Sequence, residues 1–224
     1  MKKQWCIGTI TADYLWRMEQ VLNTYEQPYN PKRPVICFDE RPCQLLGDVL
    51  MPIAMKPGRV ERQDYHYKRN GTCVVLMAVE PLAGHRTVKV TEQKTKKDYA
   101  DFMKNLALKY ADAEKIILVQ DNLNTHNPSS FYEAFDADEA FALSERFQMI
   151  YTPKKASWLN MAEIELSALS KQCLDRRIDQ KNILAKEVLA WSKKRNHLRT
   201  KITWQFTKIK AREKFNKIYK TIKN

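Results

Sequence analysis

The sequence predicts an α/β fold, built on a mixed five-stranded sheet in the strand order 3-2-1-4-5 with helices on both faces and extra C-terminal helices. Residues 35–40 and 116–120 are short apolar runs, which are typical of parallel strands buried on both faces. Residues 72–80 and 85–92 are two further strand patterns, and the four residues between them allow only antiparallel pairing. A helical pattern at 95–110 supplies the crossover that makes 116–120 parallel to 35–40.

The N-terminal part begins with a helix pattern. Residues 11–26 place Leu15, Met18 and Leu22 on one helical face, and Thr11 is a suitable N-cap. Three prolines in 27–34 end this helix before the first strand. We expect 41–70 to be irregular because it contains several prolines, and we expect Asn70-Gly71 to form a hairpin turn.

The second half alternates helices with strands and then becomes wholly helical. The helix at 95–110 is amphipathic, with Tyr99, Phe102 and Leu106 on its buried face. In chain order we then expect the strand 116–120, a helical stretch at 129–145 in one or two pieces, a strand at 147–153 ended by Pro153, and helices at 161–176, 181–195 and 207–222.

Positive charge is concentrated at the C-terminal end. The chain has a net charge of +13, and residues 191–224 alone hold twelve Lys and Arg against one Glu, a net of +11. Such a block, here with interspersed aromatic residues, is typical of a surface that binds a polyanion, although a solvated basic tail is the alternative. We divide the chain into an N-terminal linker and helix (1–32), a core (33–178) and a basic helical extension (179–224).

Composition excludes several classes of protein. A hydrophobic content of 44% with 10% aromatic residues excludes general disorder. No apolar run reaches the ~20 residues needed to span a bilayer, and the first residues lack a secretory signal, so we expect a cytoplasmic protein without a membrane partner. The five cysteines include no CxxC pair, which argues against zinc, and Cys37 and Cys73 are expected in the core.

Two of the predicted strands end in a carboxylate. Asp39 closes the strand 35–40 and Asp121 follows the strand 116–120. In the predicted strand order these strands are parallel neighbours, so both side chains emerge at one edge of the sheet, where α/β proteins bind ligands. Two carboxylates so close repel each other unless a cation lies between them, and Mg²⁺ or Mn²⁺ prefers such oxygen ligands. The alternative is an ordinary turn, since Asp is common at strand ends.

Glu163 is the candidate for a third acid, at the start of the helix that follows the last strand. Its alternative role is local, because Asn160 and Glu163 have the spacing of a capping box. Glu165 points roughly 200° away around the helix and cannot share the role of Glu163. Glu40 lies on the opposite strand face from Asp39 and is interpreted as structural.

Several motifs together resemble a known family. They are CFDE at 37–40, DNLNTH at 121–126, YTPKKASWLNMAEIE at 151–165, RNGTCVVLMAVEPLAG at 69–84, QCLDRRI at 172–178 and WQFTKIKAREKF at 204–215. With these motifs the chain resembles the DDE endonuclease core of bacterial insertion-sequence transposases, in the "six-thirty" branch of the mariner-like superfamily. The resemblance covers nearly the whole chain. It departs from mariner itself in a longer gap between Asp121 and Glu163, which the helical segment 135–146 accounts for.

The resemblance implies an RNase H-like fold and an active site made of Asp39, Asp121 and Glu163. In the family these acids hold two Mg²⁺ (or Mn²⁺) ions, water cuts the transposon end, and the freed 3′-hydroxyl then attacks target DNA. His126 and Asn122 are possible accessory residues, and hydrogen bonding within the loop is the alternative for His126. The candidate DNA-binding residues are Lys154, Lys155, Trp158, Lys193, Lys194, Arg195, Arg199, Lys208, Lys210 and Arg212. Core packing is the alternative for Trp158.

The expected partners are transposon-end and target DNA, with a homodimer in the DNA complex. Only about thirty residues precede the first catalytic strand, too few for the helix-turn-helix region of such transposases. We therefore hypothesise that an upstream half is made in a second reading frame, joined by slippage at the codons for Met1-Lys2-Lys3. The competing functions are a DNA-binding remnant without activity and an RNase H-like nuclease of other purpose.

Overall fold

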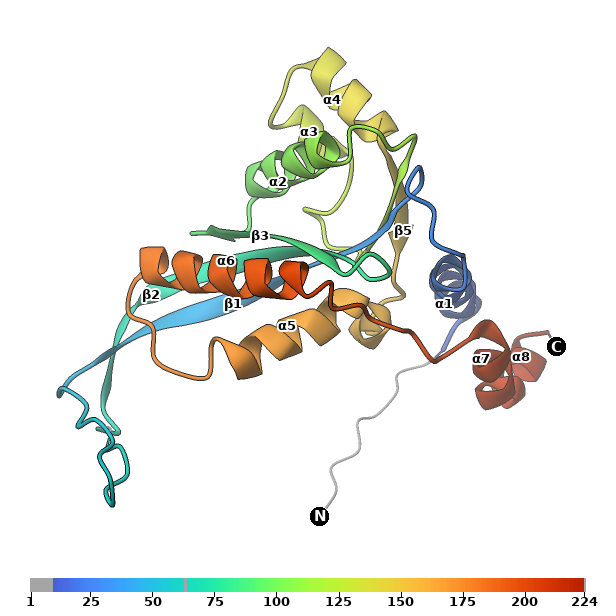
Figure 1. Cartoon of the computed structure of the whole chain (residues 1–224). Coiled ribbons are helices and arrows are strands. Elements are labelled where there is room, and N and C mark those ends of the chain that lie inside the picture. Colours follow the sequence, from blue (N-terminus) through green and yellow to red (C-terminus); the bar gives the residue numbers. More distant parts are fainter. Residues whose placement is uncertain (1–9, 63, 224) are drawn as a thin grey trace.

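The computed structural model describes residues 10–62 and 64–223 and has a five-stranded sheet at its centre (Figure 1). The strands are β1 (Val35–Asp48), β2 (Tyr67–Glu80), β3 (His85–Thr91), β4 (Ile116–Gln120) and β5 (Phe147–Tyr151). Their order is β3-β2-β1-β4-β5, with β1 antiparallel to β2 and parallel to β4, and β4 parallel to β5. The predicted fold class and strand order are confirmed.

Helices cover both faces of the sheet (Figure 1). One layer contains α2 (Lys96–Lys109), α3 (Ser129–Tyr132) and α4 (Ala137–Glu145). The other contains α5 (Met161–Gln172) and α6 (Lys181–His197), and α1 (Ala12–Tyr25) lies beside them next to β5. Because side chains alternate along a strand, β1 sends Phe38 into the α2 core and Cys37 into the α5 core. Both predicted core cysteines, Cys37 and Cys73, are buried; Cys6 lies outside the described residues.

The helix starts follow the capping signals in the sequence. Thr11 caps α1 by accepting a hydrogen bond from the Tyr14 N–H, as predicted. Thr95 and Asp98 form a capping box at the start of α2. Among the described residues, no helix is long and apolar enough to cross a membrane.

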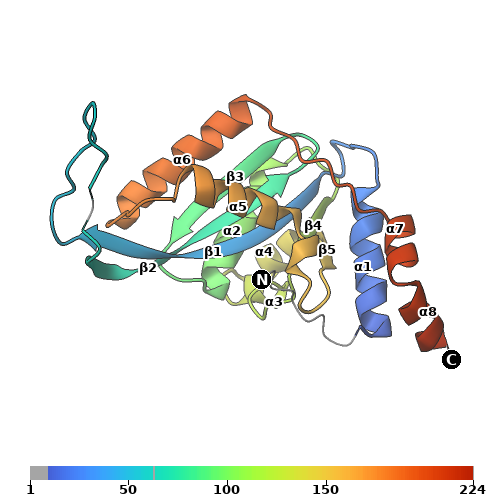
Figure 2. The same ribbon diagram turned by 90° about the horizontal axis from the view of Figure 1, so that it is seen from below.

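Two of the predicted C-terminal helices have different ends. The stretch at 207–222 is two helices, α7 (Lys208–Lys214) and α8 (Asn216–Lys223), with a break at Phe215. They pack beside α1 (Figure 2), where Glu19 accepts hydrogen bonds from Arg212 and from the Tyr219 hydroxyl. The helix predicted at 161–176 ends at Gln172, and Arg177 in the following segment donates a hydrogen bond to Asp48.

The prediction for residues 41–70 was wrong in two ways. Strand β1 continues through Pro42 to Asp48, which is possible because β4 pairs only with Val35–Cys37 and leaves an open edge beyond. Asn70-Gly71 is not a hairpin turn; it lies inside β2, opposite a shift in register between Gln44 and Leu46. Gly71 has a φ of 111°, which suits a β-bulge that only glycine adopts easily.

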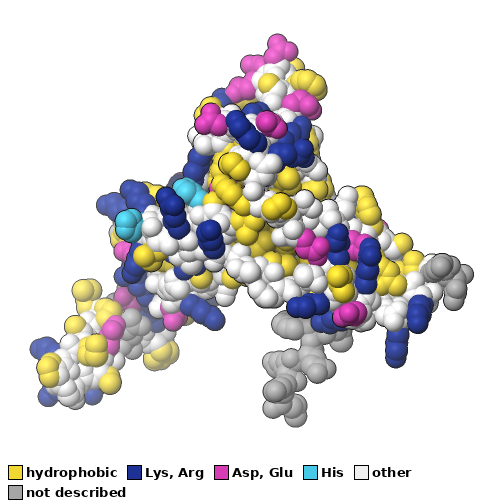
Figure 3. Space-filling model, turned by 45° about the vertical axis from the view of Figure 1, so that its right-hand side comes forward, with side chains coloured by type: hydrophobic (Ala, Val, Ile, Leu, Met, Phe, Trp, Pro, Cys, Tyr) yellow, Lys and Arg dark blue, Asp and Glu magenta, His cyan; other side chains and the backbone are white. Residues whose placement is uncertain are grey.

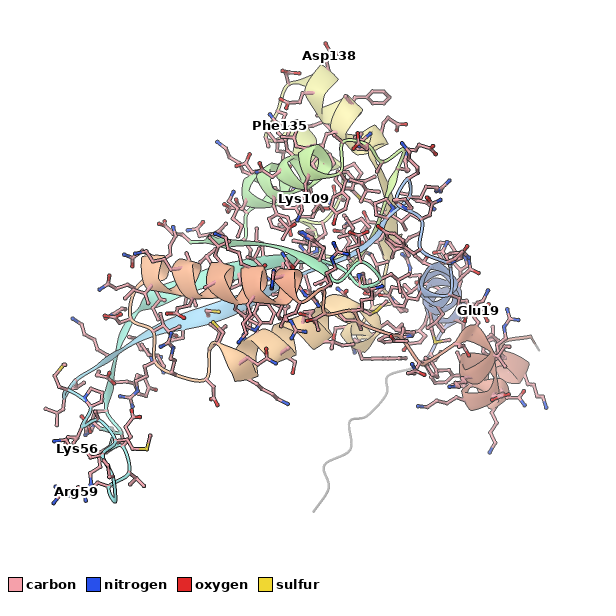
Figure 4. All side chains as sticks on the ribbon, in the orientation of Figure 1. Glu19, Lys56, Arg59, Lys109, Phe135 and Asp138 are labelled. Atoms are coloured by element: carbon pink, nitrogen blue, oxygen red, sulfur yellow. The ribbon has the colours of Figure 1, made fainter. Side chains whose placement is uncertain are left out.

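The connection between β1 and β2, residues 49–66, projects away from the sheet; we call it the β1–β2 arm (Figure 1). Its tip carries Lys56 and Arg59 (Figure 4). Hydrophobic side chains gather on its surface (Figure 3), and Met51 is 89% exposed. None of the described residues of the arm belongs to either hydrophobic core.

Candidate active site

Asp39 and Asp121 leave the sheet at the same edge. The last residues paired between β1 and β4 are Cys37 and Val119. Asp39 and Asp121 each come two residues later on their own strand, so the register places them side by side where the parallel pair separates. The sequence-based prediction for these two residues is consistent with this register.

Asp39 is a half-buried carboxylate in a negatively charged environment. It accepts hydrogen bonds from the Glu40 N–H (2.8 Å) and from Nδ2 of Asn160 (3.2 Å). Burial, together with the negative charges of Glu163, Asp121 and Glu40, raises the pKa of Asp39 to about 7, although the hydrogen bond from the Glu40 N–H acts to lower it. The carboxylates of Glu163 and Asp121 thus both oppose the ionisation of Asp39.

Asp121 is held by a histidine from its own loop. His126 is 1% exposed and donates from Nδ1 to Oδ1 of Asp121, while its Nε2 donates to Oε2 of Glu40 at 2.8 Å. Burial alone would lower the pKa of His126, but its bonds to Asp121 and Glu40 prevail and raise it to about 9. The imidazole is therefore a buried cation at neutral pH, between two carboxylates.

The loop that carries His126 is fixed by buried hydrogen bonds. Gln120, the last residue of β4, donates from Nε2 to the His126 carbonyl (2.9 Å) and accepts from the Tyr99 hydroxyl (2.9 Å). Ser130 donates to the carbonyl of Thr125 (2.8 Å). His126 thus belongs to a rigid turn, as the loop-bonding alternative proposed, and it also contacts a predicted catalytic acid.

Glu40 has a role in this site that the sequence did not reveal. As predicted, Glu40 lies on the opposite face of β1 from Asp39, which is the face toward α2. There its carboxylate pairs with His126, and its Oε1 lies 3.0 Å from Nζ of Lys94. Burial would raise the pKa of Glu40, but these two cations lower it. No local signal links Glu40 to residues 54 and 86 positions later, so only the fold could identify the pairing.

Asn160 fixes the start of α5 against β1. Its Nδ2 donates to the Phe38 carbonyl (2.8 Å) and to Asp39, and its Oδ1 accepts from the Ala162 N–H (3.1 Å). It therefore caps the helix without the predicted bond to the Glu163 N–H, and the capping-box alternative does not describe this site. Glu163, on the first turn of α5, is exposed.

The chemistry of these donors suits a divalent cation. Asp39, Asp121 and Glu163 are all oxygen donors, and burial followed by the neighbouring negative charges raises the pKa of Asp39, an effect that a cation would reverse. Within residues 10–62 and 64–223, however, no three His, Cys, Asp or Glu side chains already stand close enough together to hold one ion. The chemistry of these three carboxylates fits Mg²⁺ or Mn²⁺, and their side chains must move closer together to bind the same ion.

The predicted DNA-binding residues near these acids are exposed. Lys154 and Lys155 lie on the turn after β5, where Lys155 has a φ of 61°. Trp158 is 45% exposed and contacts the edge of the Phe206 ring, with ring centroids 5.7 Å apart. Core packing is therefore not its role.

The predicted basic residues farther along the chain fall into two groups. Lys193, Lys194 and Arg199 are exposed at the end of α6 and just beyond it, and Lys210 is exposed on α7. Others are paired within the protein: Arg212 with Glu19, Lys208 with Asn23, and Arg195 with Glu165. Arg195 is the one whose guanidinium is committed to a buried partner, so we remove it from the proposed DNA surface.

Comparisons with known proteins bear on both the family and the fold. A family model described as DDE superfamily endonuclease matches residues 34–185. The comparison with curated proteins gave no match. The structure is similar to the Mos1 transposase paired-end complex with left transposon end, with a TM-score of 0.58, 12% identity, and coverage of 89% of this chain and 63% of that one.

Two further solved structures extend this comparison. The Mos1 mariner paired-end complex with Mn gives a TM-score of 0.56 at 12% identity, covering 89% of this chain and 61% of that one. The catalytic domain of Mos1 mariner transposase gives 0.54 at 12% identity, covering 88% and 96%. The chain thus spans about three-fifths of the Mos1 chains in these complexes but nearly all of the catalytic domain. It has the RNase H-like fold of such cores.

Proposed function

The chain belongs to the DDE superfamily of endonucleases, and we propose that it is the catalytic domain of a transposase, which cuts DNA at transposon ends and joins the freed 3′-hydroxyl to target DNA. The observation that carries this proposal is that Asp39 and Asp121 follow neighbouring parallel strands at one edge of a sheet with this fold, and that Asn160 bonds Asp39 to the start of the helix that carries Glu163. The finer assignment, to the "six-thirty" branch of bacterial insertion-sequence transposases, rests on the sequence motifs.

The proposed reaction needs two Mg²⁺ or Mn²⁺ ions, which when bound would activate the attacking hydroxyl and stabilise the leaving oxygen. Asp39, Asp121 and Glu163 would supply the protein ligands. Asn160 orients Asp39 and His126 orients Asp121, so two of the three ligands have a second residue that limits their rotation. No covalent protein nucleophile is required.

The proposed DNA surface combines two basic regions. Lys154, Lys155 and Trp158 follow β5 beside the acids, where lysines can neutralise phosphates and an exposed indole can stack on a base. Lys193, Lys194 and Arg199 at the end of α6, with Lys208, Lys210 and Arg212 on α7, would contact the DNA backbone farther away. Lys208 and Arg212 must give up or share intramolecular partners to do so.

We also propose that a second copy joins in the DNA complex. The β1–β2 arm exposes a set of large hydrophobic side chains that neither core covers. Its exposed members are Val49, Leu50, Met51, Ile53, Met55 and Val60. An upstream helix-turn-helix half and a cytoplasmic, nucleoid-associated location remain predictions; reading the nucleotides before the Met1 codon tests the first.

A nicking assay tests the proposed function. The purified chain is incubated with labelled duplex carrying the element end, with and without Mn²⁺, beside Asp121→Asn. We expect Mn²⁺-dependent 3′-ends at the element boundary from the wild type only, with salt-sensitive DNA binding in both. Binding without nicking at any metal concentration would refute the enzyme and favour the inactive remnant, and cutting without preference for the element end would favour a nuclease of other purpose.

A further inference from the structure

Helix α5 carries two carboxylates two residues apart with opposite surroundings. Glu163 is exposed beside Asp39, whereas Glu165 is 1% exposed in the protein interior. At about 100° per residue the two side chains leave the helix roughly 200° apart. The direction of the buried Glu165 side chain therefore indicates how α5 is rotated about its axis.

Glu165 is bound by two arginines from different elements. Its Oε2 accepts from Nε of Arg86 on β3 (2.9 Å) and from Nε of Arg195 on α6 (2.8 Å), and its Oε1 accepts from Nη2 of Arg195 (2.7 Å). The Glu165 carboxylate thus forms ion pairs with both guanidinium groups. We call Glu165, Arg86 and Arg195 the Glu165 network.

Arg86 is also bonded to the end of α6 and the residues just after it. The Arg86 N–H donates to Oδ1 of Asn196 (2.7 Å), and Nδ2 of Asn196 donates back to the Arg86 carbonyl (2.9 Å). Arg86 also donates from Nη2 to the Thr200 carbonyl. These bonds join the end of α6 to β3, so the two elements that carry Arg195 and Arg86 are fixed to each other beside the Glu165 carboxylate.

The other attachment of α5 lies at its first residue. Asn160 bonds to Phe38 and Asp39 on β1, and the Tyr25 hydroxyl donates to the Leu159 carbonyl (2.8 Å). This attachment fixes where the helix begins, and its rotation is restricted both by the Glu165 network and by the core residues Met161, Ala162, Leu166 and Leu169. Glu163 lies between the two attachments, so its direction depends on both.

We propose that the Glu165 network is a positioning device, in which Glu165 sets the rotation of α5 and thereby directs Glu163 toward Asp39. The inference rests on the proposed function, because Glu163 is there a metal ligand. Burying Glu165 and Arg86 and partly burying Arg195 is not needed for stability alone, since apolar residues of similar volume often pack as well. Three directional hydrogen bonds to one carboxylate do, however, specify orientation.

The test is Glu165→Gln, which keeps the shape of the side chain and removes its charge. Its matched control is Glu187→Gln, which removes the same charge from the exposed Arg176–Glu187 ion pair on α6. Two readouts are taken from each: the Mn²⁺ concentration that gives half-maximal nicking, and a crystal structure of the metal-free protein. Arg195→Lys, which keeps the charge but loses the bidentate bond, serves as the conservative variant.

In Glu165→Gln we expect the Glu163 carboxylate to move by more than about 1 Å relative to Asp39, and half-saturating Mn²⁺ to rise about tenfold. DNA affinity should change less than twofold, Arg195→Lys should be intermediate, and Glu187→Gln should match the wild type. A folded Glu165→Gln protein with Glu163 unmoved would overturn the inference, whether or not the chain cuts DNA. Movement of Glu163 in a protein whose wild type never nicks would support the positioning and refute the proposed function instead.

Discussion

Replacing Asp39 by asparagine should stabilise the metal-free protein at alkaline pH. Asp39 is the acid on which burial and neighbouring negative charge act together, and they raise its pKa from 3.8 to about 7. Asparagine has nearly the same shape and no charge, so it removes this cost while an oxygen remains to accept from the Glu40 N–H. Residues selected for metal binding are often not optimal for stability.

The size and sign of the effect follow from linkage. A pKa about three units above that of the unfolded chain costs about 4 kcal/mol when the group is fully ionised in both states. Because the pKa of Asp39 is higher in the folded state than in the unfolded state, the wild type does not bear this cost below about pH 4. Its stability falls as the pH rises through about 7, where folded Asp39 ionises. Subtracting about 1 kcal/mol for the weakened bond to Asn160 leaves a gain of about 3 kcal/mol at pH 8 and close to zero at pH 4.5.

The assay is thermal unfolding followed by circular dichroism, in EDTA, at pH 8 and pH 4.5. For a chain of this length a gain of 3 kcal/mol raises the Tm by about 6–12 °C. Asp138→Asn, an exposed carboxylate on α4 (Figure 4), is the control and should change the Tm little at either pH. Mn²⁺ at a hundred times its Kd should stabilise the wild type by about 2.7 kcal/mol and Asp39→Asn by less.

Two results would refute this reasoning. If Asp39→Asn melted at or below the wild-type temperature at pH 8, the carboxylate would not be destabilising. If the gain were equal at both pH values, its origin would not be the ionisation of Asp39.

Four further variants probe other parts of the molecule. Glu163→Gln should abolish Mn²⁺-dependent nicking with a Tm within about 2 °C of wild type, because the side chain is exposed; a large loss of Tm would contradict this. His126→Gln should lower stability in urea by about 3 kcal/mol at pH 7, since it removes the buried cation between Asp121 and Glu40 and leaves Glu40 with Lys94 alone. That loss should shrink as pH rises through about 9, where wild-type His126 becomes neutral, and a pH-independent loss would argue against a charged imidazole. Gly84→Ala should cost about 2 kcal/mol or more in the same assay, because φ is 70° and an added Cβ would lie 2.5 Å from the Arg199 carbonyl; an unchanged midpoint would refute the close contact. The pair Lys193→Ala and Lys194→Ala should reduce the slope of log affinity for DNA against log salt by about 2, and an unchanged slope would remove these residues from the DNA surface.

Local patterns were enough to predict the elements that pack in the usual way. The apolar run at 116–120, the amphipathic face of 95–110 and the Thr11 cap all appear as expected, because each depends on neighbouring residues. The strand order followed from the crossover between 92 and 116. Residues 41–70 could not be predicted, because proline is tolerated only if a strand has an open edge, and that depends on how far β4 extends.

The candidate site likewise contains residues that the sequence indicates and contacts that only the fold reveals. Asp39, Asp121 and Glu163 are prominent in the sequence because polar residues end apolar runs or follow a cap. The bonds from Glu40 to His126 and from Arg195 to Glu165 join residues far apart in the chain, so no local pattern indicates them. Arg195 shows the resulting error: its place in a basic block favoured DNA binding, while the fold gives it a buried partner.

The alternation of side chains along β1 limits how this protein can change. Phe38, Asp39 and Glu40 serve the aromatic core, the site and the His126 pairing in turn, on alternating faces. Inserting or deleting a single residue upstream in the strand would move every following side chain to the opposite face. A carboxylate would then lie among the phenyl rings of the core, and a phenyl ring would lie at the candidate site. Length variants among homologues should therefore be found in the arm and be missing from the first half of β1.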